Sequence, residues 1–320
     1  MLIAGDLGGT KSNLGAFELQ QGKLVPRARK RVASHEYRKA EDLVADFTRG
    51  VNGRVTAACF AIAGPVVNNT VRATNLPWVV EGAGLARVLG VPRVRLLNDL
   101  EATGYGIGVL EPSEIETLHA GVPNPQATKA VIAAGTGLGE AILFWDGARH
   151  LPMATEAGHS DFAPRNEKEI ELWRFLKARN DFVSIELILS GRGFLSIHEL
   201  LGPGVTHRGF EDTEMDPAPI ITQQALAKSC PVCVATLDMW VAMYGAEAGN
   251  LALRSVAQGG IYVAGGIAIK VLPKLLDGRF AAAFVAKEKL GSFLERIPIY
   301  VVLNEDAPLL GAAHVASLAQ

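Results

Sequence analysis

Short apolar runs that end in glycine-rich turns dominate the beginning of the chain. Leu2-Ile3-Ala4 enters the turn Gly5-Asp6-Leu7-Gly8-Gly9-Thr10, and residues 13–19 follow as a second strand. A third strand is expected over residues 24–33, where arginines alternate with other side chains. Strand-forming residues at these spacings predict a three-stranded antiparallel meander.

The same pattern returns about 130 residues later. The apolar run Ala130-Val131-Ile132-Ala133-Ala134 leads into Gly135-Thr136-Gly137-Leu138-Gly139, and residues 141–145 again resemble a strand. The chain therefore contains two related strand–turn–strand units, which suggests two lobes built on one plan.

The remaining apolar patterns predict strands that are covered by helices. Helices are expected over residues 37–49, 81–89, 99–108, 166–179, 232–253 and 309–318, and strands over 55–62, 94–97, 261–264 and 299–303. Ser184 is expected to cap a short helix that runs to Leu189 and ends at Gly191. Buried strands with covering helices indicate an α/β fold.

Composition narrows the class of protein. The chain has 320 residues, of which 49% are hydrophobic and 20% charged, and these values fit a soluble globular protein of about two domains. The net charge of −2 and the lack of a basic stripe argue against nucleic acid as a partner. No basic segment precedes Asp6, so no signal peptide is expected. The apolar helix over 232–253 carries Asp238 and Glu247, which favours a buried core helix over a membrane span.

Three cysteines imply no disulfide framework and favour a reducing cytoplasm. Cys230-Pro231-Val232-Cys233 has the spacing of a redox motif or of half a zinc site. No second pair of Cys or His lies close to it in sequence, so a metal or redox role is not expected.

The first glycine turn has the features of a phosphate cradle. Adjacent glycines let backbone N–H groups approach an anion, Thr10 adds a hydroxyl donor, and the Asp6 carboxylate can hold hydrated magnesium. The turn is no P-loop, because Thr10 stands where that motif has glycine and a strand follows in place of a helix. An ordinary glycine-rich hairpin remains an alternative for this motif alone. Its echo at Gly135-Thr136-Gly137 favours two lobes that clamp one nucleotide.

Two further clusters could bind and activate a hydroxyl compound. Asp99 follows a buried strand beside Asn98, where a carboxylate can accept the proton of an attacking hydroxyl; the alternative is a simple helix cap. Glu156 and His159 flank small residues, so both side chains can converge on one polyol. Metal ligation with Asp161, or a histidine with a purely structural role, would also fit these residues.

Taken together, these motifs resemble the bacterial glucokinases of the hexokinase, Hsp70 and actin superfold, essentially from end to end. The landmarks occur in the family's order: Asp6-Leu7-Gly8-Gly9-Thr10-Lys11, Ala61-Ile62-Ala63-Gly64-Pro65, Leu97-Asn98-Asp99, Gly135-Thr136-Gly137-Leu138-Gly139, Glu156 to His159, Asp161-Phe162-Ala163-Pro164, Ser184-Ile185-Glu186 with Leu189-Ser190-Gly191, and Ala264-Gly265-Gly266-Ile267. Each is weak alone, but eight landmarks in order are specific.

The resemblance implies ATP-dependent phosphorylation of glucose at its 6-hydroxyl, with Asp99 as general base. It implies that the sugar is bound by Asn98, Asp99, Glu156, His159, Glu186, Gly64, Pro65 and Asn75. It also implies that ATP is bound by Gly5, Asp6, Leu7, Gly8, Gly9, Thr10, Gly135, Thr136, Gly137, Gly265 and Gly266. Mg²⁺ would be held near Asp6 through water.

The fold implied is the two-lobed actin-like (ribonuclease H-like) α/β fold, with duplicated strand–phosphate turn–strand units. Residues 1–109 with 300–320 would form a small lobe and 110–299 a large lobe, with the active site in a cleft between them. Glucose and ATP are the expected partners, with no nucleic acid and no membrane. The expected protein is a cytoplasmic homodimer.

Two departures from the family pattern bear on this prediction. Ala157 replaces the first of two glycines between Glu and His, which would cost about 1 kcal/mol if that position needs positive φ. Nothing like the cysteine-rich zinc motif of the related ROK sugar kinases follows His159, so no structural zinc is expected.

Three alternatives keep the same scaffold but change the function. A kinase for fructose, mannose or an N-acetylated amino sugar would use similar hydroxyl-binding residues. A non-catalytic sugar sensor would commonly carry a helix-turn-helix ahead of the first phosphate turn, which here begins at Gly5, and would not need Asp99. An actin-like or Hsp70-like ATPase would not need the sugar-binding set.

Overall fold

The protein is described from a computed structural model, and the described residues are 1–74, 76–210 and 216–319. The chain divides into two compact units. The first unit comprises Met1–Glu114, Ala148–Ala154 and Asn304–Gln320, and the second comprises Ile115–Gly147 and Thr155–Leu303. The lobe boundaries expected from the sequence remain a prediction.

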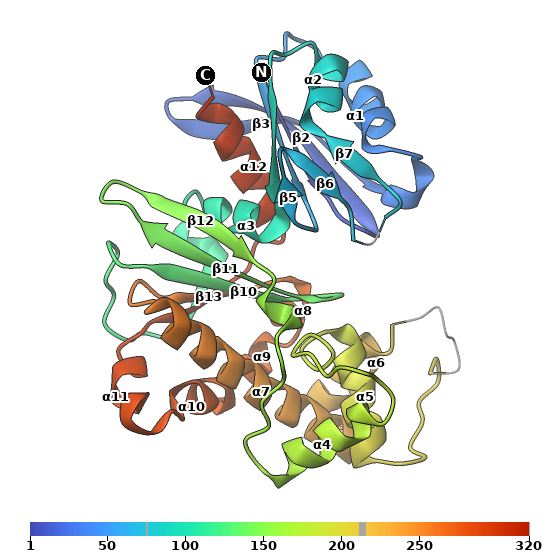
Figure 1. Cartoon of the computed structure of the whole chain (residues 1–320), viewed down its shortest axis with the longest axis vertical. Coiled ribbons are helices and arrows are strands. Elements are labelled where there is room, and N and C mark those ends of the chain that lie inside the picture. Colours follow the sequence, from blue (N-terminus) through green and yellow to red (C-terminus); the bar gives the residue numbers. More distant parts are fainter. Residues whose placement is uncertain (75, 211–215, 320) are drawn as a thin grey trace. The chain divides into compact units, whose positions relative to one another are not determined.

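The first unit is built on a five-stranded sheet with the order β3-β2-β1-β4-β8 (Figure 1). Its strands are β1 Leu2–Leu7, β2 Lys11–Gln20, β3 Lys23–Ala33, β4 Ala57–Ile62 and β8 Val94–Asn98. β1 pairs antiparallel with β2 and parallel with β4, which in turn pairs parallel with β8. The predicted meander over the first three strands is confirmed.

Helices bury both faces of this sheet. They are α1 Ala40–Arg49, α2 Gly82–Leu89, α3 Asp99–Ile107 and α12 Ala307–Ser317. Side chains alternate between the faces along β1: Ile3 belongs to the core cluster that contains Phe47 and Leu85, whereas Leu2 and Ala4 belong to the cluster that contains α12 residues. This double burial explains why β1 and β4 are apolar almost throughout.

The second unit repeats the plan. Its sheet has the order β12-β11-β10-β13-β14-β9, although nearly all of the edge strand β12 falls within residues 148–154, which are counted with the first unit. The strands are β9 Ile115–His119, β10 Lys129–Ala134, β11 Leu138–Trp145, β12 His150–Thr155, β13 Ile261–Ala264 and β14 Ile299–Val302. As in the first unit, the central strand pairs antiparallel with the strand after its glycine turn and parallel with the next, β13. The recurrence seen in the sequence is therefore a repeat of sheet topology.

A long helix, α7 Pro231–Ser255, supports the second sheet from below its central strand, where the Tyr244 hydroxyl donates to the Ile132 carbonyl over 3.2 Å. The other helices of this unit are α4 Glu167–Lys177, α5 Gly191–Leu201, α6 Ala218–Leu226, α8 Gly266–Lys270, α9 Leu272–Leu275, α10 Arg279–Val285 and α11 Gly291–Leu294. A small sheet of β5 Val66–Val67, β6 Thr70–Arg72 and β7 Val79–Glu81 belongs to the first unit.

One predicted element is wrong. Ser184 does not cap a helix that ends at Gly191; residues 184–190 form turns, and Gly191 begins α5. Ser184 pairs with Asp161 in an isolated bridge, and the Gly191 N–H donates to the Gly135 carbonyl over 2.9 Å. Contacts with segments distant in sequence thus override the local capping signal.

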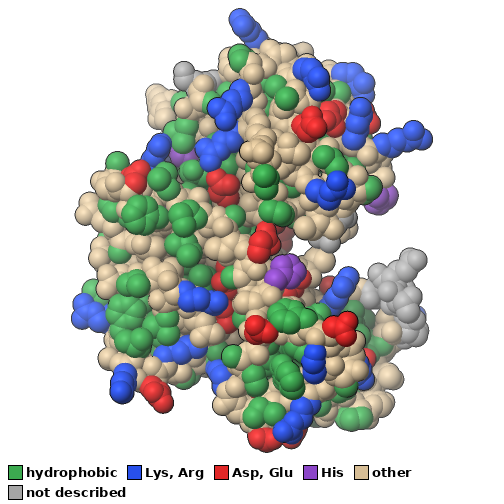
Figure 2. Space-filling model, viewed as in Figure 1, with side chains coloured by type: hydrophobic (Ala, Val, Ile, Leu, Met, Phe, Trp, Pro, Cys, Tyr) green, Lys and Arg blue, Asp and Glu red, His purple; other side chains and the backbone are tan. Residues whose placement is uncertain are grey.

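Charged side chains of both signs are interspersed with hydrophobic ones on the face shown in Figure 2, in keeping with the small net charge of −2. Within the described ranges, no single helix is both long and apolar enough to cross a membrane. The bent pair of α6 and α7 passes that test only as a pair, by length and composition.

Candidate active site

The turn between β1 and β2 is anchored by two buried serines. Ser34 donates its N–H to the Thr10 carbonyl over 3.0 Å and its hydroxyl to the Gly8 carbonyl over 2.6 Å. The Ser12 hydroxyl lies 2.9 Å from that of Ser34. In the described part of the chain, the N–H groups of Gly8, Gly9 and Thr10 donate to no acceptor. The turn therefore presents several amide donors from a fixed backbone, as anion binding requires.

Gly5 and Leu7, the neighbours of this turn in β1, contribute to the position of the turn through their packing. A Cβ on Gly5 would lie 2.5 Å from the Phe60 ring, so only glycine fits between the strands there. The Leu7 side chain is buried in the core of the first unit. Both residues fix the direction in which β1 enters the turn.

Asp6 lies at the end of β1 in an unusual electrostatic setting. Asn13 donates to its carboxylate over 3.4 Å. Burial, followed by repulsion from the Asp99 carboxylate, raises the pKa of Asp6 to about 7. Two carboxyl groups that disfavour each other's charge favour a cation between them, and oxygen ligands of this type suit Mg²⁺.

Asn98 and Asp99 divide two tasks at the start of α3. Asn98 is the N-cap: its side-chain oxygen accepts from the Leu100 N–H over 2.8 Å, and its amide donates to the Gly64 carbonyl over 3.2 Å. Asp99 Oδ1 accepts from the Leu100 N–H over 3.0 Å. The capping role considered for Asp99 therefore belongs to Asn98, and the Asp99 carboxylate is oriented at the helix N-terminus.

The loop after β4 is tied to this segment through Gly64. Gly64 has a φ of +126°, and a Cβ there would lie 3.0 Å from the Arg72 carbonyl, so the loop requires glycine. Pro65, next in the chain, is exposed. Asn75, also expected in the sugar site, lies outside the described residues.

In the second unit, two glycine turns lie at the ends of neighbouring parallel strands. The pairing of β10 with β13 ends at Ala133 and Ala264, two residues before Gly135 and one residue before Gly265. Gly265 has a φ of +89°, and a Cβ there would lie 2.6 Å from the Ala134 carbonyl. The strand pairing therefore brings Gly135-Thr136-Gly137 and Gly265-Gly266 together, where one elongated ligand can contact both turns.

The segment from Glu156 to His159 forms a single 3₁₀ turn in which both of these side chains are exposed. A Cβ on Gly158 would lie 2.1 Å from the Leu138 carbonyl, so this position requires glycine. Ala157 is not among the residues with positive φ. The alanine is therefore accommodated without backbone strain, and the expected penalty at this departure from the family pattern does not arise.

Glu186 connects this turn to the glycine turn at residues 135–137. Its carboxylate accepts from the Leu138 N–H over 2.9 Å, and its own N–H donates to the Gly158 carbonyl over 2.9 Å. A Cβ on Gly137 would lie 2.4 Å from the carboxylate, so that glycine makes room for it. Three motifs far apart in sequence thus form one bonded cluster within the second unit.

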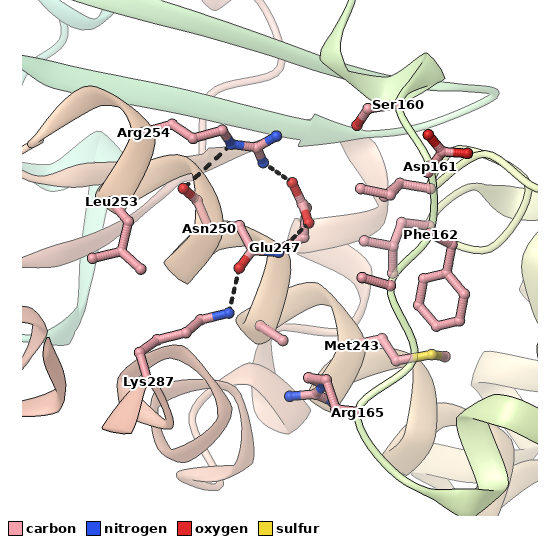
Figure 3. A pocket seen from close by; sticks show the side chains of 14 residues that line it. Ser160, Asp161, Phe162, Arg165, Met243, Glu247, Asn250, Leu253, Arg254 and Lys287 are labelled. Carbon is pink, nitrogen blue, oxygen red and sulfur yellow. Dashed lines mark hydrogen bonds and ion pairs between the residues drawn. The ribbon is translucent and has the colours of Figure 1, made fainter. Parts of the chain in front are cut away.

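A pocket of about 520 Å³ lies behind this cluster, between residues 160–165 and α7 (Figure 3). Ser160, Asp161 and Phe162 line one side, and Arg254 and Lys287 lie on the other. Sequence reasoning missed this cavity, because only one of its walls carries a motif, Asp161-Phe162-Ala163-Pro164, and the polar residues of α7 that face it carry none.

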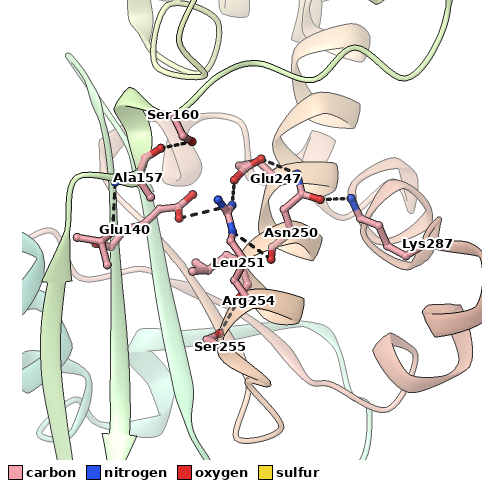
Figure 4. Close-up of polar contacts among 10 residues, drawn as sticks. Glu140, Ala157, Ser160, Glu247, Asn250, Leu251, Arg254, Ser255 and Lys287 are labelled. Atoms are coloured by element: carbon pink, nitrogen blue, oxygen red, sulfur yellow. Dashed lines mark hydrogen bonds and ion pairs between the residues drawn. The ribbon is translucent and has the colours of Figure 1, made fainter.

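A buried ion cluster extends from this pocket beneath β11 (Figure 4). Glu140 is 1% exposed and forms no hydrogen bond through its carboxylate among the described residues; Arg254 lies 3.9 Å away. Arg254 also pairs with Glu247, which accepts from Asn250 over 2.7 Å. Burial, followed by repulsion from Glu247, raises the pKa of Glu140 to about 8. The Glu140 carbonyl accepts from the Thr155 hydroxyl over 3.0 Å, so the cluster borders the backbone that carries Glu156.

Comparison with known proteins agrees with these motifs. The family model for glucokinase matches residues 3–319. The chain belongs to the glucokinase family. The glucokinase of Nostoc punctiforme is 37% identical to it, with 99% of each chain covered. A crystal structure of glucokinase from an Antarctic psychrotroph has a TM-score of 0.85 at 26% identity, covering 99% of this chain and 98% of that one. A glucokinase of Balamuthia mandrillaris, solved in complex with glucose, has a TM-score of 0.81 at 22% identity, covering 99% and 93%.

As a glucokinase family member, the chain is an ATP-dependent sugar kinase that phosphorylates glucose. Its fold is the two-lobed actin-like α/β fold expected from the sequence. The strand order β3-β2-β1-β4-β8 of the first sheet recurs as β12-β11-β10-β13-β14 in the second, in agreement with the duplicated strand–turn–strand units of the sequence.

Proposed function

We propose that the chain transfers the γ-phosphoryl group of ATP to the 6-hydroxyl of glucose, with Asp99 as general base. The observation that carries this assignment is the placement of the Asp99 carboxylate. The Leu100 N–H holds it at the N-terminus of α3, close enough to Asp6 for their charges to interact, and Asp6 lies at the end of the strand that leads into the first glycine turn. A base and an anion cradle thus lie at the ends of β1 and β8, the two parallel strands that flank β4 in one sheet.

In this mechanism Asp99 accepts the proton of the 6-hydroxyl as its oxygen attacks the γ-phosphorus. The bond from that phosphorus to the β–γ bridging oxygen breaks, and ADP leaves. The amides of Gly8, Gly9 and Thr10 would bind phosphate oxygens, as would Thr136 and Gly137 in the second unit. Such transfer needs mainly alignment and charge neutralisation from the protein.

We assign sugar binding to Glu156 and His159, whose side chains are exposed, and to the polar edges of Asn98 and Gly64. Glu186 can share in this only with the lone pairs left by its bond to Leu138. Pro65 and Asn75 stay in the proposed sugar set. Gly265 and Gly266 are proposed to lie against the adenosine, with Gly5 and Leu7 supporting the first turn.

Mg²⁺ fits Asp6, because its buried carboxylate is close enough to that of Asp99 for the two charges to repel, and a cation would relieve that repulsion. The ion would be held there through water and would supply charge neutralisation for the β- and γ-phosphates. Omitting Mg²⁺ should abolish turnover. We further propose a cytoplasmic location, since the three cysteines are free thiols and the family chemistry uses cellular ATP. We also propose a homodimer, as the family resemblance implies, and sedimentation analysis tests it.

Asp99→Asn tests the base assignment. The amide keeps an oxygen that can accept from the Leu100 N–H but cannot take a proton, so kcat should fall by roughly 10²–10⁴ while the glucose Kd stays within a few-fold. The measurements are steady-state kinetics and glucose titration by calorimetry. Asp42→Asn, at an exposed position of α1, is the matched control and should leave kcat unchanged. Full phosphoryl transfer by Asp99→Asn would show that Asp99 is not the base.

A further inference from the structure

Four side chains that can ligate a metal converge in the second unit. His198 comes from α5, and His207 comes from the segment that follows α5 in sequence. Cys230 and Cys233 come from the start of α7. Taking one ligand atom from each residue, all four atoms lie within 4.8 Å of one another. None of these residues takes part in the proposed phosphoryl transfer.

The cluster is buried and incompletely satisfied. His198 is 1% exposed, Cys230 8% and Cys233 0%. The buried Nε2 of His198 has no hydrogen-bond partner within the described ranges, although buried polar atoms usually have one. Cys233 Sγ lies 3.2 Å from His207 Nε2. An unpartnered imidazole nitrogen beside two thiols and a second imidazole offers the ligand atoms that a soft divalent metal ion binds.

We propose that His198, His207, Cys230 and Cys233 bind one Zn²⁺ in a closed tetrahedral site. Zinc bonds of about 2.3 Å to sulfur and about 2.0–2.1 Å to nitrogen place tetrahedral ligand atoms roughly 3.3–3.8 Å apart. The observed limit of 4.8 Å needs only small side-chain rotations to reach this geometry. Two thiolates with two imidazoles select zinc over the hard ions that prefer oxygen.

The site is structural, because four protein ligands leave no open position for a substrate. It would fasten the end of α5 and the following chain to the N-terminus of α7. α5 begins at Gly191, whose N–H binds the Gly135 carbonyl, so the same helix also reaches the second glycine turn. A redox role for Cys230 and Cys233 fits less well, because an attacking thiol must be accessible and both are buried.

Sequence alone did not lead to this site. Eight residues separate His198 from His207, and 22 separate His207 from Cys230, so the two pairs do not look like one motif. The packing of α5 on α7 supplies the second pair that the Cys230–Cys233 spacing lacked. The sequence led us to expect no metal at Cys230 and Cys233, for lack of a nearby second pair, and no structural zinc after His159. Neither expectation could take account of histidines that the fold brings close.

Metal analysis of the full-length chain tests the proposal. Protein reconstituted with Zn²⁺ under reducing conditions and desalted should retain about one zinc per chain by mass spectrometry. Replacement by Co²⁺ should give the absorption of tetrahedral cobalt with thiolate charge-transfer bands. His207→Gln, at a partly exposed position, and Cys233→Ser should each lower zinc retention at least tenfold. Cys59→Ala, in the core of the first unit, is the thiol control and should retain zinc fully.

Removal of the metal should also lower the thermal midpoint of the parent chain, because a ligand that binds only the folded state stabilises that state. The midpoint of His207→Gln should not change. The proposal is overturned if the reconstituted parent retains no more zinc than His207→Gln. It is equally overturned if Cys230 and Cys233 form a disulfide and the reduced protein still takes up no zinc or cobalt. None of these readouts depends on phosphoryl transfer, so they remain separate from the test of Asp99.

Discussion

At the scale of single residues, the positions in the turn from Glu156 to His159 differ sharply in which side chains they tolerate. Gly158 is packed against the Leu138 carbonyl, so any side chain there collides with the strand that follows the Gly135–Gly137 turn. Ala157, its neighbour, has no positive φ and a partly exposed side chain. The second glycine of the family's pair is therefore the one that this structure requires.

Gly158→Ala should displace the segment that carries Glu156 and His159. A Cβ placed 2.1 Å from a carbonyl oxygen forces a backbone shift, and overpacking of this kind costs about 1–3 kcal/mol of stability. Because small displacements of binding groups strongly lower the rate of catalysis, kcat/KM for glucose should fall roughly 10- to 100-fold. Steady-state kinetics and chemical unfolding measure the two effects. The control Ala157→Gly should change kcat/KM less than about twofold; equal losses in both variants would contradict the packing argument.

Sequence reasoning singled out candidate residues at this scale but did not determine the contacts that each one makes. Asn98 and Asp99 were singled out as a pair, and the structure shows that the helix cap is Asn98. Glu186 was expected to bind sugar, yet its carboxylate accepts from the Leu138 N–H. Such roles depend on hydrogen bonds between segments distant in sequence, which motif spacing does not encode.

At the scale of elements, the glycine turns and their strands were predictable because each is a local signal. An apolar run followed by glycine specified β1, β4, β10 and β13 within a few residues. The predicted helix from Ser184 to Leu189 failed, because Ser184 pairs with Asp161 and the turns there are held by tertiary contacts. The ion cluster around Glu140 was invisible for the same reason: its members come from β11 and α7.

Glu140 should make stability depend on pH. Its pKa is about 8 in the folded chain, against about 4.5 when unfolded, so between these values the folded state holds a proton that the unfolded state releases. The stabilisation is full below about pH 4.5 and is lost as pH rises towards 8. Glu140→Gln should remove this loss, so its unfolding free energy should gain on the parent by on the order of 1–3 kcal/mol from pH 5 to pH 8.

Chemical unfolding at several pH values measures that difference. Glu81→Gln, at an exposed position of the first unit, is the control and should follow the parent at every pH. Parallel stability curves for the parent and Glu140→Gln would mean that Arg254 already neutralises Glu140 in the folded chain.

At the scale of the whole molecule, strands β12-β11-β10-β13-β14 of the second sheet repeat the order β3-β2-β1-β4-β8 of the first. Of the residues proposed for the site, Asp99, Asp6 and one glycine turn lie in the first unit, and Glu156, His159 and the other glycine turns lie in the second. The full-length match to glucokinases agrees with the sugar-kinase activity proposed for these residues. The sequence predicted the fold and reaction through ordered motifs, but preference among hexoses depends on pocket shape.

The most direct test of the account is kcat/KM with ATP across a panel of hexoses, measured by coupling ADP release to a dehydrogenase. We expect the highest value for glucose, lower values for fructose, mannose and N-acetylglucosamine, and negligible ADP release without sugar. A higher kcat/KM for any other hexose, or ATP hydrolysis that sugar does not stimulate, would contradict the proposed function.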